Sequence, residues 1–156
     1  MKFTPPPRDH MLFIRTDFSD DGAWRTIVDA ATQKSRMGYQ AALHLVDDRA
    51  YERATVDDIV SSNLFGKSMA CFVADERTMA DPDHAILCIN LMRSMEPFRV
   101  VPEWVSDVEA NLSIANVDFE DYAEQCGADG VYRGYEPNPR TEFFIQMMKK
   151  TFNLPD

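Results

Sequence analysis

The sequence predicts a three-layer α/β/α domain whose central sheet is mostly parallel and has about five strands. Short apolar segments alternate with segments in which apolar residues recur every three or four positions, the order expected for parallel strands joined by right-handed crossovers. The predicted strands are apolar throughout, as expected when helices cover both faces of a sheet. The chain has 156 residues, 45% of them hydrophobic, which suits one domain with its own core.

The first half of the chain is predicted to contain an extended arm, three strands and two helices. The arm, residues 1–9, includes three consecutive prolines, which favour an extended backbone. The strands are expected at 10–18, 39–48 and 68–76. Ser19 is a candidate cap for the first helix, which is expected to end near Gly38. Thr55 is expected to cap the second helix, and Gly66 to stop it.

The second half is predicted to contain two further strands and two helices. The strands are expected at 85–92 and 98–102, and residues 130–135 are either a short edge strand or an irregular crossing. Pro102 suits the first position of a helix because its missing N–H group would have no partner there. Asp118 can cap a further short helix that closes at Gly127. We therefore expect residues 10–135 to form a single α/β domain.

A Pro-rich break precedes a C-terminal extension, residues 136–156, which is expected to form one more helix at about 141–153. One polar stripe runs along this helix, and the other positions are largely apolar. The apolar residues include Phe143, Phe144, Met147, Met148 and Phe152. A helix of this kind is covered on most sides, usually by its own domain. Its terminal position makes a second subunit a reasonable alternative, so these residues form a candidate oligomer or partner helix.

The net charge of −10, from 26 acids and 16 bases, disfavours binding to nucleic acid phosphates and favours a basic partner or a cation. No apolar run approaches the roughly 20 residues of a membrane span, and the N-terminus has no apolar signal region. We therefore expect a cytoplasmic protein that binds no membrane. The three cysteines have no C-x-x-C spacing, and we expect reduced, mostly buried thiols.

Aspartates follow the first three predicted strands, and their role decides whether the chain resembles an enzyme. Asp17, Asp47 and Asp75 would meet at the carboxyl edge of a parallel sheet, where open α/β proteins bind ligands. Together with Asp20, these carboxylates could hold Mg²⁺, and Asp17, Asp20 and Asp75 are the candidate metal ligands. The alternative is local, because aspartates are common at helix starts and in loops. The second interpretation is favoured.

Known catalytic motifs are absent from the sequence. It contains no phosphate-binding G-x-x-x-x-G-K-[ST] loop, no dinucleotide-binding G-x-G-x-x-G loop and no G-x-S-x-G nucleophile elbow. No catalytic residue and no cofactor is therefore predicted, apart from the possible Mg²⁺.

Three stretches together resemble one known family. They are "LFIRTDFSDDGAW" at 12–24, "FRVVPEWVSDVEANLSIANVDFEDYAE" at 98–124 and "DGVYRGY" at 129–135. They are similar to a family of small bacterial proteins described only as a domain of unknown function. The resemblance covers most of residues 11–135 and leaves the C-terminal helix outside. It implies no activity and no catalytic residues.

The second of these stretches has two possible roles. Asn111, Asn116 and Asp118 could contact a ligand near the carboxyl edge. Alternatively, Asn116 ends one helix and Asp118 starts the next, with Asp121 as the acid of a capping box. The capping interpretation is favoured, because Asn and Asp are among the commonest caps.

Three functions remain open at this point. The first is a non-enzymatic interaction or regulatory protein that binds a protein partner or itself. The second is a Mg²⁺-dependent enzyme that acts on a phosphate-containing substrate at the carboxyl edge. The third is a small-molecule sensor that uses the same edge.

Overall fold

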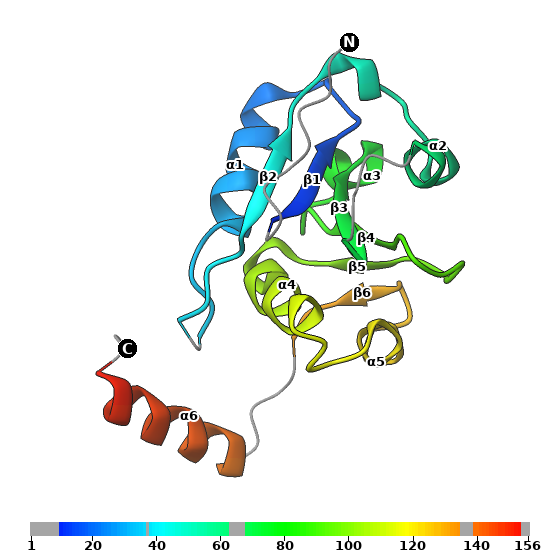
Figure 1. The fold of residues 1–156 in the computed structure, drawn as a ribbon. Coiled ribbons are helices and arrows are strands. Elements are labelled where there is room, and N and C mark those ends of the chain that lie inside the picture. Colours follow the sequence, from blue (N-terminus) through cyan, green and yellow to red (C-terminus); the bar gives the residue numbers. More distant parts are fainter. Residues whose placement is uncertain (1–9, 37, 63–67, 135–138, 154–156) are drawn as a thin grey trace.

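The computed structural model describes residues 10–36, 38–62, 68–134 and 139–153, and Figure 1 shows their arrangement. The fold is mixed α/β, with one six-stranded sheet in the order β2-β1-β3-β4-β5-β6. The strands are β1 (Met11–Arg15), β2 (Leu43–Val46), β3 (Ala70–Ala74), β4 (Ile86–Asn90), β5 (Phe98–Val100) and β6 (Val131–Tyr132). The predicted N-terminal arm lies outside the described residues.

The sheet matches the expected mostly parallel arrangement only in part. Strand β1 pairs in parallel with β2 and β3, and β5 pairs in parallel with β6. Strand β4 runs antiparallel to both of its neighbours, β3 and β5. The carboxyl ends of the other five strands therefore lie along one edge of the sheet, and only β4 begins there.

Short connections explain the reversed direction of β4. The chain passes from Ala74 to Ile86 through a five-residue helix at the edge of the sheet. A parallel partner would require a crossover of a dozen or more residues that returns along the sheet to its opposite edge. The β4–β5 connection, residues 91–97, is shorter still and also reverses the chain.

Six α-helices and two short 3-10 helices accompany the sheet in the described part of the chain. The α-helices are α1 (Asp21–Ala31), α2 (Val56–Ser61), α3 (Glu76–Ala80), α4 (Val105–Ser113), α5 (Phe119–Glu124) and α6 (Pro139–Phe152). The 3-10 helices are η1 (Arg49–Tyr51) and η2 (Pro102–Trp104), the second of which leads directly into α4. None of the described helices has the length and apolar character needed to cross a bilayer.

The core consists of two apolar layers, one on each face of the sheet. Phe13 and Phe72 point into the larger layer, where α1, α4 and α5 pack. Leu12 and Val73, which are neighbours of these residues along the strands, point into the other layer with Ile59 of α2. Alternate residues of β1 and β3 thus face opposite layers, which explains why these strands are apolar at every position except Arg15.

The helix boundaries differ from the expected ones at the first helix. Asp20, not Ser19, caps α1, because the Asp20 carboxylate accepts a hydrogen bond from the Ala23 backbone N–H at 2.9 Å. The helix ends at Ala31, before the predicted stop at Gly38. Thr55 caps α2 as expected and forms a capping box with Asp58. The predicted stop at Gly66 lies outside the described residues.

Candidate functional site

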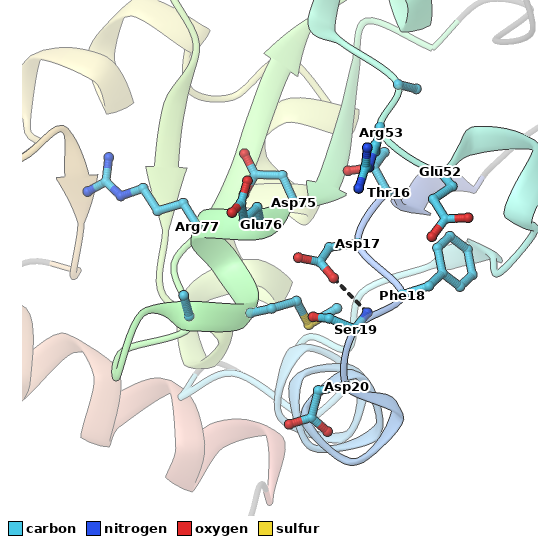
Figure 2. Close-up of a pocket in the computed structure, with 13 residues that line it drawn as sticks. Thr16, Asp17, Phe18, Ser19, Asp20, Glu52, Arg53, Asp75, Glu76 and Arg77 are labelled. Atoms are coloured by element: carbon cyan, nitrogen blue, oxygen red, sulfur yellow. Dashed lines mark hydrogen bonds between the residues drawn. The ribbon is translucent and has the colours of Figure 1, made fainter.

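A crevice opens at the carboxyl edge of the sheet between β1 and β3. It has a volume of about 1060 Å³ and is bounded by three segments of the chain. These are the β1–α1 loop, the segment after η1 and the start of α3 (Figure 2). The lining residues are Thr16, Asp17, Phe18, Ser19, Asp20, Glu52, Arg53, Ala54, Asp75, Glu76, Arg77, Met79 and Ala80.

Arg15, the last residue of β1, holds one wall of this crevice. Its side chain is only 3% exposed, and its guanidinium reaches Asp21 at 2.7 Å and Asp47 at 3.2 Å. Its Nε atom also donates to the backbone carbonyl of Asp17 at 2.9 Å. The hydrogen bond from Arg15 lowers the pKa of Asp21. One buried cation therefore ties the end of β1 to the start of α1 and to the end of β2.

Phe18 packs between two arginines at the same place. The Arg15 guanidinium lies 4.4 Å from the centre of the Phe18 ring, and the Arg49 guanidinium lies 5.0 Å from it. Cation–π contacts of this kind contribute roughly 0.5–1 kcal/mol each at exposed sites. The "RTDF" stretch thus forms a rigid corner, with Arg15 and Phe18 as its fixed points.

The aspartates of the β1–α1 loop shape the backbone. The Asp17 carboxylate accepts a hydrogen bond from the Ser19 backbone N–H at 2.7 Å, as an Asx turn does. Asp20 is the cap of α1. Both residues line the crevice, as the carboxyl-edge hypothesis requires, and both also have the local roles that the alternative requires.

Asp75 begins α3 on the opposite wall and is held by a cation from β5. Its carboxylate accepts from the Thr78 backbone N–H at 3.0 Å and from both terminal nitrogens of Arg99, at 2.9 and 2.6 Å. Burial raises the pKa of Asp75, but the bonds from Arg99 and Thr78 outweigh it, so this pKa lies below its usual value. Asp75 therefore stays ionised and fixes the start of α3.

The predicted metal ligands do not converge on one point. Within the described residues, no three His, Cys, Asp or Glu side chains are grouped so that they could hold a metal ion. Asp47 lies on the same edge as the crevice, but it bonds to Arg15 and is not part of the lining. Binding of Mg²⁺ by Asp17, Asp20 and Asp75 stays a prediction.

The asparagines of the α4–α5 corner lie away from the crevice lining and bond to each other. The Asn116 side chain donates to the Asn111 side-chain oxygen at 2.8 Å, and the Asn111 side chain donates to the Asp107 carbonyl at 2.9 Å. Asp118 is the cap of α5, and its backbone N–H donates to the Asp121 carboxylate at 3.2 Å. Their geometry is that of a tight helix–helix corner.

The predicted partner helix, α6, lies apart from the sheet and its covering helices (Figure 1). Phe143 is 70% exposed, Met147 47% and Phe152 63%, whereas Met148 is half-buried. The Phe144 side chain is outside the described part. The domain, which usually covers such a helix, therefore leaves Phe143, Met147 and Phe152 exposed.

The model of one sequence family, Domain of unknown function (DUF6924), matches residues 10–135. The chain belongs to this family. No curated protein matches the sequence. The part matched by DUF6924 contains the whole sheet, the crevice and the α4–α5 corner, and it ends before α6. The resemblance seen in the three motifs is thereby confirmed as family membership in DUF6924, which carries no assigned activity.

Three arginines that shape the DUF6924 site were missed at the level of sequence. Arg15 and Arg99 lie in strands that are otherwise apolar, and a charge in such a strand requires a partner. That signal could have shown that each of the two arginines has a carboxylate partner. Arg53 lines the crevice from the loop after η1, and no local pattern marks it.

Proposed function

We propose that this chain is a non-enzymatic interaction protein and that it binds a second copy of itself through α6. The observation that carries this proposal is the exposure of large apolar side chains on a helix that stands apart from the folded domain. Phe143 and Met147 are one helical turn apart, so their side chains lie on one face. An exposed apolar face of this kind marks an interaction site in soluble proteins.

The charge of the helix favours a copy of the same chain as the partner. Residues 139–153 contain three bases and one acid, a net charge of +2, which leaves −12 for the rest of the chain. The helix is therefore opposite in sign to the domain that another copy would present. Complementary charges steer association and fix the orientation of two partners.

The expected affinity is moderate. Full burial of a Phe or Met side chain contributes about 1.5–3 kcal/mol. Three such side chains from each copy would contribute at most roughly 9–18 kcal/mol, because Phe152 lies on another side of the helix than Phe143 and Met147. The cost of association, about 4–15 kcal/mol, is then subtracted. We take a dissociation constant on the order of micromolar, equivalent to about −8 kcal/mol, as the working value, because it lies within the difference between these two ranges.

The carboxyl-edge acids support a role without catalysis. Asp20 and Asp75 cap helices, and Asp47 neutralises Arg15. Each of these carboxylates has a hydrogen-bond or ion-pair partner that accounts for its position. A structural task is therefore sufficient to explain why these acids lie at the edge.

The proposal is tested by the molar mass of a triple variant, Phe143→Ser, Met147→Ser and Phe152→Ser, measured by light scattering. We expect a dimer for the unaltered chain and a monomer for the variant. Met92→Ser is the matched control, because Met92 is also 70% exposed but lies in the β4–β5 connection. It should leave the dimer intact.

A folded triple variant with the same mass as the unaltered chain would overturn the proposal. An unaltered chain that is monomeric but captures a different protein through α6 would likewise exclude self-association as its role.

A further inference from the structure

The crevice lies at the point where the connections of the sheet change direction. Strand β1 lies between β2 and β3, and the chain reaches β2 through α1 but β3 through α2. Helix α1 packs on one face of the sheet and α2 on the other. Neighbouring strands whose connections leave on opposite faces create a gap beyond their carboxyl ends, and open α/β proteins bind ligands in this gap.

The walls of the crevice are held in place without a ligand. Arg15 fixes the β1–α1 loop through Asp21 and Asp47, and Arg99 fixes the start of α3 through Asp75. The third wall is tied to the first by the Arg53 backbone N–H, which donates to the Thr16 carbonyl at 2.9 Å. The volume of the crevice, about 1060 Å³, lies just above the usual range of about 300–1,000 Å³ for small-molecule sites.

The lining contains charges of both signs that other residues do not neutralise. Asp75, Glu52 and Arg77 each have an ion-pair partner. Four lining charges have no ion-pair partner in the described part of the chain. They are the three acids Asp17, Asp20 and Glu76 and the one base Arg53.

These charges are distributed over different walls. Figure 2 shows the Asp17 carboxylate extending toward Glu76 on the α3 side, while Arg53 reaches in beside Thr16 from the loop after η1. Phe18 and Met79 add apolar surface to the lining. A ligand in this space would meet two carboxylates on one side, a guanidinium on another and apolar side chains nearby.

We propose that the crevice binds a basic α-amino acid, such as lysine or arginine. The amino groups of the ligand would pair with Asp17 and Glu76, and its carboxylate would pair with Arg53. Two of the unpaired acids, Asp17 and Glu76, and the unpaired base Arg53 match the two positive charges and the one negative charge of such a ligand. Arginine–carboxylate pairs are often two-pronged, which would fix the orientation of the ligand. This site is separate from α6 and does not depend on self-association.

The test is a calorimetric titration of the full-length chain with three probes. L-Lysine carries both kinds of charge, 1,5-diaminopentane lacks the carboxylate, and glutarate lacks the amines. We expect L-lysine to bind more tightly than either of the other two probes. The variants are Arg53→Gln, Asp17→Asn and Glu76→Gln, and circular dichroism verifies that each is folded. Asn at position 17 retains an oxygen for the Ser19 N–H.

The arginine variant and the two acid variants have different expected effects. Arg53→Gln should weaken L-lysine binding about tenfold or more, the loss expected for a charge-assisted hydrogen bond, and leave diaminopentane binding unchanged. Asp17→Asn and Glu76→Gln should weaken the binding of both amines. The control variants Arg36→Gln and Glu124→Gln, which change exposed charges outside the lining, should bind L-lysine like the unaltered chain.

Several results would overturn the proposal. One is the absence of binding to both L-lysine and L-arginine at 10 mM. This concentration is about ten times a dissociation constant of 1 mM, which would already be weak binding. Another is L-lysine binding that all three crevice variants leave unchanged. Equal affinity for diaminopentane would show a simple cation site. Tighter binding of Mg²⁺ that Asp17→Asn abolishes would show a metal site. Light scattering reports separately on self-association, so the two proposals fail independently.

Discussion

Arg99 and Asp75 form a two-pronged ion pair that joins the middle of β5 to the N-cap of α3. The two bonds measure 2.9 Å and 2.6 Å, and the side chains are 12% and 28% exposed. Arg99 also donates to the Ala85 carbonyl at 3.1 Å. The pair thus links three segments that are distant in the sequence and forms the back of one crevice wall.

Replacing Arg99 with lysine should destabilise the protein although the charge is kept. A lysine ammonium is a single point charge and cannot span both Asp75 oxygens and the Ala85 carbonyl at once. We expect a loss of about 1.5–3 kcal/mol in the free energy of unfolding, measured by urea denaturation. Arg25→Lys, at an exposed position of α1, should change it by less than about 0.5 kcal/mol. Equal effects of the two variants would show that the pair contributes nothing specific.

Two aspartates should respond to pH in opposite directions. The pKa of Asp75 is lowered in the folded state, because the bonds from Arg99 and Thr78 outweigh the effect of burial. Its contribution to stability is therefore present above the unfolded value of about 3.9 and is lost as the pH falls through the folded value. Burial raises the pKa of Asp107, so its ionised form costs stability at neutral pH.

Asp75→Asn should thus lower the free energy of unfolding at pH 7, and the difference from the unaltered chain should shrink below about pH 4. Asp107→Asn should raise this free energy at pH 7, and the gain should fade below about pH 4. Denaturation in urea between pH 3.5 and pH 7 measures both differences. Two shifts of the same sign at pH 7 would contradict the assigned environments.

Gly134 and Gly130 provide a matched pair of glycines in the "GVYRG" stretch. Both have a positive φ, +82° and +75°. A Cβ atom at Gly134 would overlap the Trp104 ring, whereas one at Gly130 would meet nothing within 4 Å. Gly130→Ala should therefore cost only the backbone term, about 1–2 kcal/mol, and Gly134→Ala should cost about 1–3 kcal/mol more. If thermal melts show equal losses, the Trp104 contact does not restrict position 134.

Much of the first half of the fold could be predicted from the sequence. The run of apolar residues before Arg15 and the spacing of Trp24, Ile27 and Ala31 identify β1 and α1, and the structure confirms both. Strand signals also located the later strands. Local patterns are sufficient here because each segment buries one apolar face against the same sheet.

Strand direction and the site geometry were harder to predict. The apolar run at Ile86–Asn90 indicates a strand, but its direction depends on the path of the preceding connection, which has no local signature. The partners of Arg15 and Arg99 are distant in the sequence or lie on other elements, so only the charge within an apolar strand hinted at them. Ser and Asp are both good helix caps, so the sequence alone did not show that Asp20, and not the preceding Ser19, caps α1.

Charge reversal on α6 should weaken self-association without removing apolar surface. Lys149→Glu with Lys150→Glu changes the net charge of residues 139–153 from +2 to −2, which is then the same sign as the rest of the chain. We expect the dimer dissociation constant to rise about tenfold, as measured by analytical ultracentrifugation. A matched double variant, Lys149→Arg with Lys150→Arg, should leave it unchanged. A charge-reversed chain that dimerises as well as the unaltered one would show that charge does not guide the contact.

The most direct test of self-association is the molar mass of the unaltered chain over a dilution series from about 100 to 0.1 micromolar, a range that brackets the expected dissociation constant. We predict a mass near twice 17.8 kDa at the highest concentration and near 17.8 kDa at the lowest. A mass of one chain throughout the series would contradict self-association through α6.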